Sequence, residues 1–440
     1  MERKNLILLQ LPSPYLLVQK WVLPMTLINI KTYLLSKTYN CNVKIINLAG
    51  VKNWQNLIPL DADYYGISAF TPQIKVAKQV IDFLKERSKG KIIIGGHHVT
   101  ALPVETMENL DPDIVIIGEG EEIIKEIISG KDLSEIMGIA YRDNKNQIIV
   151  NDRMPFIKDI DNIPFPKIDE FNLDEYPGMK LLSPNSKYQI GLVTSRGCPH
   201  KCIFCDANNF WMNTLRYHSA DYLIEQFNYL RSFGINNFRF DDDNFALKTK
   251  RLEKLVDNFV SNKSTWHCPI RSDTVTDNLV RLMKESGCTH VSIGVETGSD
   301  KMLKLLKKAT TVEKHKQAIA LLKKYGIKVD TYILLGLPLE TEETINETLE
   351  FCKTQPIDHF DIATFVPFPG NEIYHNPSKY NFDIENDPLF SNFYTKSNYF
   401  PVKSVSEEGN RVLKMQTKLI EFLLERSTNK RAFNFSNNIK

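Results

Sequence analysis

The stretch Thr194-Ser-Arg-Gly-Cys-Pro-His-Lys-Cys-Ile-Phe-Cys205 places three cysteines within eight residues, at positions 198, 202 and 205. Clustered thiolates bind metal centres, and an iron–sulfur cube takes one protein ligand for each of its irons. A cube held by only three cysteines keeps one iron open for a substrate or a cofactor. This spacing therefore favours redox chemistry on a bound small molecule over simple electron storage.

Zinc is the main alternative for this cluster, because His200 offers a fourth ligand for a Cys3His site. His200 lies only two residues from Cys198 and from Cys202, which is a cramped spacing for ligands of one small ion. A disulfide is a weaker interpretation, since nothing else in the chain is typical of a secreted protein. The spacing favours an iron–sulfur cluster and leaves zinc open.

Length and composition are those of an ordinary globular protein with room for two or three domains. The chain has 440 residues, of which 42% are hydrophobic and 25% charged. The net charge of +2 argues against a dedicated nucleic-acid-binding protein, which normally shows a basic excess. The apolar run at 6–11 is too short for a signal peptide, and no run approaches the ~20 apolar residues of a membrane span. We expect a cytoplasmic enzyme without a membrane or nucleic-acid partner.

Residues 1–151 alternate short apolar runs with helical patterns. Residues 73–88 place apolar side chains on one helical stripe. The expected strands are β-branched and lack polar alternation, as is typical of a parallel sheet buried on both faces. These strands are 6–10, 43–48, 64–69, 91–95 and 113–117, followed by a hairpin of 139–142 and 147–151. The pattern predicts a doubly wound, Rossmann-like α/β domain whose ligand lies at the carboxyl ends of the strands.

A second strand–helix alternation begins at about residue 189, after a proline-rich stretch at 152–188 that we interpret as a linker. Its expected strands are 190–195, 237–242, 266–270, 290–295, 328–334 and 358–365, with helical patterns such as 221–233, 252–260 and 312–325. Six such units predict a partial (β/α)6 barrel over 189–375, and the cysteine loop follows its first strand. Chemistry in such barrels sits at the carboxyl ends of the strands. Residues 376–440 are expected to form a small helical C-terminal extension, with an amphipathic helix over 407–427.

Together the cysteine motif and the barrel pattern resemble the radical S-adenosylmethionine (SAM) superfamily. A Cys-x3-Cys-x2-Cys motif with an aromatic residue, here Phe204, before the last cysteine is its signature. The resemblance implies a [4Fe–4S] cluster on Cys198, Cys202 and Cys205, whose open iron binds SAM. It also implies an external electron donor of the flavodoxin or ferredoxin type.

Later segments match the same superfamily in chain order. Asp241 and Asp242 end the second strand, where the family contacts the methionine part of SAM; the alternative is a solvated loop or a magnesium site. Arg271 is a candidate contact for the SAM carboxylate, with a structural ion pair equally plausible. Glu296, in Ser292-Ile-Gly-Val-Glu-Thr-Gly-Ser299, is expected to face the SAM ribose or amino group.

The motif Leu334-Leu-Gly-Leu-Pro338 resembles the fifth-strand segment that supports the adenine, so that Gly336 and Pro338 are expected SAM contacts. Residues 366–370 resemble the end of the sixth strand. Expected substrate contacts are the tail after Gly370 and residues 206–218, with Phe210, Trp211 and Tyr217, although core packing explains these aromatic residues equally well.

The front domain resembles the cobalamin-binding domain that one large branch of the superfamily, the class B methyltransferase branch, carries ahead of the barrel. Its implied role is to bury the nucleotide tail of cobalamin and to present the corrin toward the barrel mouth. For any one loop alone, an ordinary tight turn remains the simpler interpretation. The implied cobalamin contacts lie in three loops: Ser68 and Thr71; Gly95, Gly96 and His97; and Gly118, Glu119, Gly120 and Glu121.

The sequence departs from relatives in informative ways. The Asp-x-His-x-x-Gly motif that gives cobalt a histidine ligand in methionine synthase is absent, and Pro24-Met-Thr replaces the Pro-Leu-Gly usual in the branch. Methylthiotransferases carry three extra cysteines in the front domain, whereas residues 1–197 hold only Cys41. The remaining cysteines, Cys268, Cys288 and Cys352, are isolated. One cluster is therefore expected.

The resemblance implies a cobalamin-dependent radical SAM enzyme that methylates an unactivated carbon of a small molecule or natural product. It would act through a 5′-deoxyadenosyl radical and methylcobalamin. The runner-up is a non-methylating oxidation, cyclisation or rearrangement on the same architecture. A cobalamin-binding regulatory module with a degenerate barrel is a third hypothesis, against which the intact cysteine triad argues. The sequence does not identify the substrate.

Overall fold

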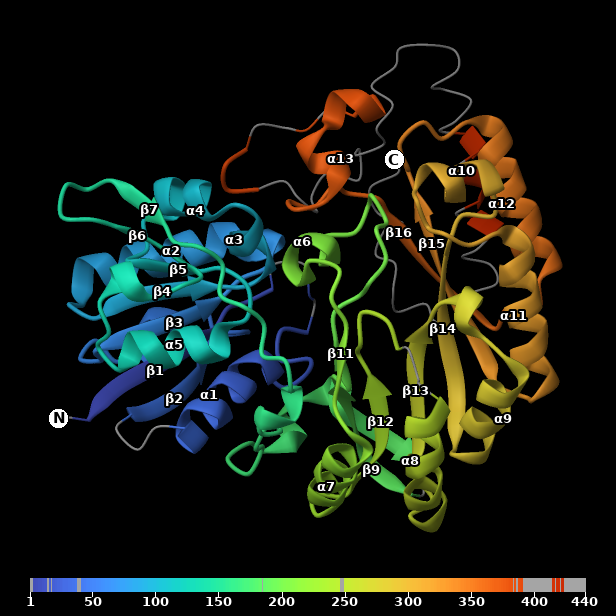
Figure 1. The fold of residues 1–440 in the computed structure, drawn as a ribbon, viewed down its shortest axis with the longest axis horizontal. Helices are drawn as coiled ribbons and strands as arrows, with labels where there is room; N and C mark the ends of the chain where they lie inside the picture. Colours follow the sequence, from blue (N-terminus) through green and yellow to red (C-terminus); the bar gives the residue numbers. More distant parts are fainter. Residues whose placement is uncertain are drawn as a thin grey trace. The chain divides into compact units, whose positions relative to one another are not determined.

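The structure is a computed structural model that describes residues 3–13, 16, 18–37, 41–183, 185–245, 249–382, 384, 387–390, 414–415, 417–419 and 421–422. The chain divides into two compact units, which Figure 1 draws in sequence colours. The first is Met1–Lys180 with Phe368–Gly370 and Glu385–Thr395. The second is Leu181–Pro367 with Asn371–Ile384 and Lys396–Lys440.

The first unit is built on a seven-stranded sheet in the order β2-β1-β3-β4-β5-β6-β7. Strands β1 to β5 run parallel, and β6 and β7 form an antiparallel hairpin at one edge. The order 2-1-3-4-5 is that of a doubly wound fold. The strands are β1 (Lys4–Gln10), β2 (Cys41–Asn47), β3 (Tyr64–Ser68), β4 (Lys91–Gly95), β5 (Ile114–Ile116), β6 (Ile139–Arg142) and β7 (Ile148–Val150).

Helices cover both faces of this sheet, which explains why its strands are apolar on both sides. One core contains the predicted stripe of α2, whose residues Ile74, Ala77, Ile81 and Leu84 are all buried. The other core contains apolar residues of α1 and α5. The helices are α1 (Met25–Lys37), α2 (Ile74–Arg87), α3 (His97–Ala101), α4 (Pro103–Leu110) and α5 (Gly120–Ile128).

The proline-rich stretch after the hairpin packs mainly with the first unit. It forms only short 3-10 turns, at Ile160–Asn162, Leu173–Glu175 and Pro177–Met179. Ile160 and Ile163 are buried against Tyr33 of α1. The next strands, β8 (Lys180–Ser183) and β9 (Ser186–Leu192), begin before residue 189.

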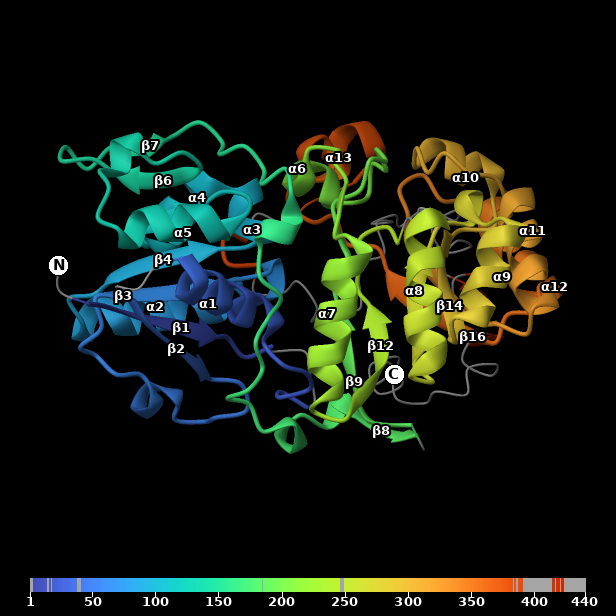
Figure 2. The same ribbon diagram turned by 60° about the horizontal axis from the view of Figure 1, so that its bottom comes forward.

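The second unit holds a seven-stranded sheet in the order β16-β15-β14-β13-β12-β9-β8. Its strands from β9 to β16 are paired in parallel. Figure 2 shows helices α7, α8, α9, α11 and α12 along one face, so that the sheet forms a curled half-barrel. The strands are β12 (Ile235–Phe240), β13 (Thr265–Ile270), β14 (Cys288–Glu296), β15 (Lys328–Leu335) and β16 (His359–Thr364).

The helices of this unit are α6 (Ala207–Trp211), α7 (Ala220–Arg231), α8 (Thr249–Ser261), α9 (Asp277–Glu285), α10 (Asp300–Leu305), α11 (Val312–Lys324), α12 (Glu342–Thr354) and α13 (Glu372–His375). Alternate strand residues such as Trp266, Val291 and Ile333 are fully buried, as expected on the helix-covered face. The doubly wound domain and the partial barrel predicted from the sequence are both confirmed.

Two sequence-based expectations differ from the structure in detail. The strand expected at 190–195 is divided, because β9 ends at Leu192 and Ser195–Arg196 forms β10, which pairs antiparallel with β11 (Arg216–Tyr217). Most of the helix expected at 407–427 lies outside the described residues, including Val412, Leu423 and Leu424; Met415 and Leu419 are described and buried. No helix in the described part of the chain is long and apolar enough to cross a membrane.

Candidate functional site

The cysteine loop lies between β10 and α6, beyond the carboxyl end of β9. Cys202 is buried, whereas Cys198 and Cys205 are half-buried. The loop begins at Gly197, which has φ +94°, and a Cβ atom there would lie 2.2 Å from the carbonyl oxygen of Thr214. Only glycine fits this position, since any side chain would meet backbone that cannot move aside.

Contacts from within and beyond its own segment hold this loop in place. The Ile203 amide donates to the Leu306 carbonyl at 3.1 Å. Asn208 Nδ2 donates to the Cys202 carbonyl at 3.0 Å, and Asn371 Nδ2 donates to the Phe204 carbonyl at 3.2 Å. Ile203 also belongs to a buried apolar cluster with residues from beyond β14, β15 and β16. These protein contacts therefore support the shape of the loop.

A buried ion pair lies beside the loop. Lys308 Nζ is 2.6 Å from Glu296 Oε1, and the two side chains are 8% and 10% exposed. Glu296 has φ +64° at a register shift between β14 and β15, a conformation that is costly for a glutamate and is typical of functional sites. Lys308 Nζ also lies 5.6 Å from the centre of the Phe204 ring. The predicted SAM residues Phe204 and Glu296 thus meet at one lysine.

Arg271 forms the structural ion pair that the sequence offered as one of its two roles. Its guanidinium pairs with both carboxylate oxygens of Asp273, at 2.9 and 3.2 Å, and donates to the Lys308 carbonyl at 2.5 Å. Burial raises the pKa of the Cys202 thiol, and the nearby charges of Lys308 and Arg271 lower it. Arg271 is therefore a structural ion pair and a direct neighbour of the cysteine loop.

The loop offers three thiols as a donor set for an iron–sulfur cube. Burial raises the pKa of all three thiols, and at Cys202 the charges of Lys308 and then Arg271 oppose this effect. Among the described residues, no three His, Cys, Asp or Glu side chains converge as ligands of a single ion would. A cube gives each thiolate its own iron, so the three thiols of this one loop are the donor set for a cube with one open iron.

The acidic run at the end of β12 is tied to protein partners. Asp242 is 4% exposed and accepts hydrogen bonds from the amide and hydroxyl of Thr194, at 2.5 and 2.6 Å, and of Ser195, at 3.2 and 2.7 Å. Burial raises the pKa of Asp242 to about 6. Asp241 instead pairs with Arg239 at 2.6 Å. Asp242 thus anchors the strand that leads into the cysteine loop.

The predicted fifth-strand motif forms a tight turn after β15. The Gly336 amide donates to Glu340 Oε2 at 3.0 Å, and Gly336 and Leu339 have positive φ on either side of Pro338. Thr341 then caps α12. This turn lies at the same sheet edge as the cysteine loop, which is where the sequence predicts the SAM contacts.

The aromatic residues predicted as substrate contacts are engaged with their own unit. Phe210 and Trp211 meet edge to face with ring centres 4.6 Å apart. Arg216 lies over the Trp211 ring at 5.6 Å, and Arg251 lies over Tyr217 at 5.2 Å. Packing within the second unit therefore accounts for the contacts of these rings.

In the first unit, two of the predicted loops meet at the carboxyl ends of β3 and β4, where Ser68 and Gly95 end the strands. Gly96 has φ +116°, and a Cβ atom there would lie 2.6 Å from the Ala69 carbonyl oxygen. Thr71 Oγ1 lies 3.1 Å from Nδ1 of His98, a side chain whose burial lowers its pKa to about 3.

His97 differs from its buried neighbour, since its ring stacks on Phe70 with centres 5.8 Å apart, and Phe70 is 50% exposed. The third loop follows β5, where the Gly118 amide donates to Thr100 Oγ1 at 3.0 Å. Glu119 precedes α5, Gly120 begins it and Glu121 is buried in its first turn. All three predicted loops therefore lie at one edge of the sheet.

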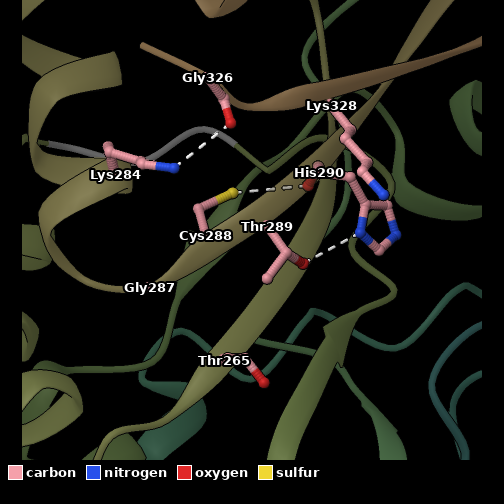
Figure 3. A pocket seen from close by; sticks show the side chains of 8 residues that line it. All are labelled: Thr265, Lys284, Gly287, Cys288, Thr289, His290, Gly326 and Lys328. Atoms are coloured by element: carbon pink, nitrogen blue, oxygen red, sulfur yellow. Dashed lines mark hydrogen bonds between the residues drawn. The ribbon is translucent and has the colours of Figure 1, made fainter. Parts of the chain in front are cut away.

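A cavity of about 560 Å³ lies at the other end of the half-barrel, at the amino ends of β13, β14 and β15. Figure 3 shows Lys284 directed at the Gly326 carbonyl and the His290 ring beside Lys328. None of the predicted site residues lines it. This cavity is therefore separate from the cysteine loop.

Sequence reasoning missed three residues that shape the site, namely Arg239, Lys308 and Asn371. Arg239 pairs with the nearby Asp241, whereas Lys308 and Asn371 contact Glu296 and Phe204, which lie 12 and 167 residues away in the chain. No local pattern distinguishes Lys308 from the exposed Lys307 before it.

Comparison with known proteins places this geometry in a family. Residues 192–352 match the radical SAM superfamily, and residues 51–128 match the B12 binding domain. The uncharacterized methyltransferase PH0819 of Pyrococcus horikoshii is 31% identical over 327 residues, which cover 71% of this chain and 69% of that protein. The chain belongs to the cobalamin-binding branch of the radical SAM superfamily. It is an enzyme of the cobalamin-dependent radical SAM methyltransferase family, and its cofactors are SAM, a [4Fe–4S] cluster and cobalamin.

Two further similarities extend this comparison. The anaerobic magnesium-protoporphyrin IX monomethyl ester cyclase of Rubrivivax gelatinosus is 25% identical over 73% of this chain, which spans 59% of the cyclase. The structure of the methyltransferase TsrM from Kitasatospora setae superposes with a TM-score of 0.73 at 15% identity, covering 85% of this chain and 76% of TsrM. The second likeness shows that the two-part fold is shared.

Proposed function

We propose that this enzyme methylates an unactivated carbon of a small-molecule substrate, with one SAM supplying the methyl group through cobalamin and a second supplying an organic radical. The observation that carries the proposal is the preorganised cysteine loop beside the buried Glu296–Lys308 pair. A structure of TsrM has a tryptophan substrate bound, which supports a small-molecule substrate here.

In this proposal Cys198, Cys202 and Cys205 hold the cluster. Glu296 accepts hydrogen bonds from the ammonium or ribose of SAM, and Lys308 pairs with the carboxylate of SAM. Both residues are proposed because their buried ion pair lies beside the cysteine loop. The remaining SAM contacts proposed are Phe204, Arg271, Asp241, Gly336 and Pro338, with Asp242 acting through the strand that it anchors.

We further propose that residues 1–151 bind cobalamin, 152–188 connect the domains, 189–375 form the radical SAM barrel and 376–440 form an extension. The cobalamin contacts proposed are Ser68, Thr71, Gly95, Gly96, His97, Gly118, Glu119, Gly120 and Glu121. A flavodoxin- or ferredoxin-type donor supplies electrons. A cytoplasmic location is supported by the cysteines, which are all free and so suit a reducing compartment.

The test is anaerobic reconstitution followed by reduction in the presence of SAM. We expect iron and sulfide for one cube per chain, and formation of both S-adenosylhomocysteine and 5′-deoxyadenosine with a product heavier by one methyl group. Cys202→Ala should lose the cluster, whereas Cys268→Ala, which removes a fully buried thiol of β13, should keep it. Zinc in place of iron would contradict the proposal. Deoxyadenosine without a methylated product would point to oxidation or cyclisation instead.

A further inference from the structure

The cavity at the amino ends of β13, β14 and β15 has a polar lining. Its volume of about 560 Å³ falls within the range of about 300–1,000 Å³ that is typical of small-molecule pockets. The described residues that line it include two lysines and neither aspartate nor glutamate: Thr265, Lys284, Gly287, Cys288, Thr289, His290, Gly326 and Lys328. Such walls suit a negatively charged ligand better than an apolar one.

The two lysines lie on different sides of this cavity. Figure 3 shows Lys284 at one side and Lys328, next to the His290 ring, at the other. Lys284 Nζ donates to the Gly326 carbonyl oxygen at 3.3 Å, which occupies one of the three hydrogens of the ammonium group. Both lysines are exposed, so a ligand can reach them without a rearrangement of the fold.

Neither Lys284 nor Lys328 forms an ion pair in the described part of the chain. Lys324, which lies two residues before Gly326, instead pairs with Asp277 at 3.2 Å. Two positive charges that face one cavity without a counter-charge repel each other, and a bound anion removes this repulsion. The two lysines therefore favour occupation of the cavity by an anion.

Carboxylates beyond the cavity wall are engaged by other cations. Glu285 of α9 pairs with Arg281 at 2.8 Å, and Asp358, at the start of β16, pairs with Lys323 at 2.8 Å. Each of these pairs is neutral as a unit, so neither cancels the charge of the cavity lysines.

A carboxylate and a guanidinium near the cavity have opposite signs. Asp330 Oδ2 lies 3.9 Å from Nε2 of the cavity-lining His290. In its described hydrogen bonds Arg231 donates to neutral oxygens, one of which is Oγ of Ser264, the residue before Thr265, at 2.8 Å. Because these two charges offset each other, the two lysines determine the sign of the field in the cavity.

Thr265 supplies a neutral donor in the same wall. Its Oγ1 accepts a hydrogen bond from Asn237 Nδ2 at 2.6 Å, so that its own hydroxyl hydrogen can be donated to a ligand. Thr289 differs, because its hydroxyl donates to the Trp266 carbonyl oxygen at 3.2 Å. The cavity therefore offers two ammonium groups and one hydroxyl group to an anion.

We propose that this cavity binds a small phosphorylated molecule, whose phosphate oxygens lie between Lys284 and Lys328 and accept a hydrogen bond from Thr265. A lysine ammonium is a compact charge with three donors, which suits the tetrahedral phosphate group. The cavity is large enough for the phosphate group together with the molecule that carries it. This site lies at the opposite end of the strands from the cysteine loop, and it does not depend on the proposed function.

The experiment is a calorimetric titration of the reconstituted full chain, loaded with cobalamin and SAM, with pyrophosphate at low ionic strength. We expect one pyrophosphate to bind per chain. Lys284→Met and Lys328→Met should each weaken binding by about tenfold, as expected when a hydrogen bond to a charged group is lost. Lys328→Arg keeps the charge and should stay within about threefold of wild type.

Lys324→Met is the matched control, because it removes the same charge from the same end of the barrel. Its side chain is 67% exposed, pairs with Asp277 and does not line the cavity. Binding to this variant should stay within about twofold of wild type, since an exposed ion pair contributes little.

Malonate, a dicarboxylate, tests whether the site prefers phosphate, and it should bind at least tenfold more weakly than pyrophosphate. Equal affinity for the two anions overturns the assignment to a phosphorylated ligand. The proposal also fails if the wild-type chain binds no pyrophosphate. An equal loss of affinity in Lys324→Met and in the two cavity variants overturns it as well, because the binding would then reflect the general surface charge.

Discussion

Lys308 Nζ lies 2.6 Å from Glu296 Oε1 in a site where both side chains are almost fully buried. Removing one member of such a pair leaves the other charge buried without a partner, which typically lowers the free energy of unfolding by about 3–5 kcal/mol. We therefore expect Lys308→Met to lower the free energy of unfolding of the second unit by that amount. Glu296→Gln in the same chain should recover most of the loss. Urea unfolding followed by tryptophan fluorescence measures both, and equal stability of the single and double variants would contradict the expectation.

Gly197 and Gly130 provide a matched pair of glycines with positive φ. A Cβ atom at Gly197 would meet the Thr214 carbonyl oxygen at 2.2 Å, whereas nothing lies within 4 Å of one at Gly130. Gly130→Ala should therefore cost only the conformational penalty of about 1–2 kcal/mol. Gly197→Ala should displace the cysteine loop and reduce the iron retained after reconstitution by more than half. Iron analysis on both variants is the measurement, and full iron retention in Gly197→Ala would argue that the loop tolerates the displacement.

Asp242 gives the protein a pH dependence of defined sign. Burial raises its folded pKa to about 6 from an ordinary value of 3.8, so that the folded state binds the proton more tightly than the unfolded state. Its contribution to stability is complete below about pH 4 and is lost as the pH rises through 6, a change of about 3 kcal/mol. Asp242→Asn should remove this part of the decline in stability between pH 4 and 6.

The control for Asp242 is Asp330 of β15, whose pKa is also raised to about 6 by burial. Asp330→Asn should flatten the same pH range without affecting the iron content, because Asp330 makes none of the contacts that anchor the cysteine loop. Asp242→Asn should reduce the iron content as well. The same iron content in both variants would show that the loop does not depend on Asp242.

Gly96 offers a test of the first unit by itself. A side chain there would approach the Ala69 carbonyl oxygen to 2.6 Å at φ +116°, and so would displace the loop between β4 and α3. We expect Gly96→Ala to lose at least tenfold in cobalamin affinity, measured from the visible absorbance of the bound corrin, and to keep its iron. Loss of iron together with cobalamin would show that the substitution unfolds more than this loop.

Much of the fold could be predicted because parallel strands buried on two faces leave a simple apolar signal. Strands β4 and β6 coincide with the expected ranges 91–95 and 139–142. The ribbon of β10 and β11 could not be predicted, since two-residue strands have no period to detect. It forms because Thr194 and Ser195 turn toward Asp242, a partner 47 or 48 residues away.

In the site, too, some features follow from the local sequence and others from contacts between residues far apart in the chain. The cysteines carry their signal in their spacing, whereas Lys307 and Lys308 are identical neighbours of which only the second is buried. Asp241 and Asp242 are likewise adjacent acids with opposite surroundings, because successive residues at a strand end point to opposite faces. One pairs with Arg239 and the other with Thr194 and Ser195. Such differences in burial and partners between adjacent residues depend on which strand lies beside them in the fold.

The anchoring of the cysteine loop by Asn208, Asn371 and Leu306 separates folding from metal assembly. These contacts join protein groups to one another, so we expect the barrel to fold without iron, unlike a zinc finger that is unfolded without its metal. We therefore expect that scaffold proteins or chemical reconstitution deliver a preformed cube to an already folded protein. Oxygen damage to the inorganic core should accordingly leave a refillable polypeptide rather than a denatured one.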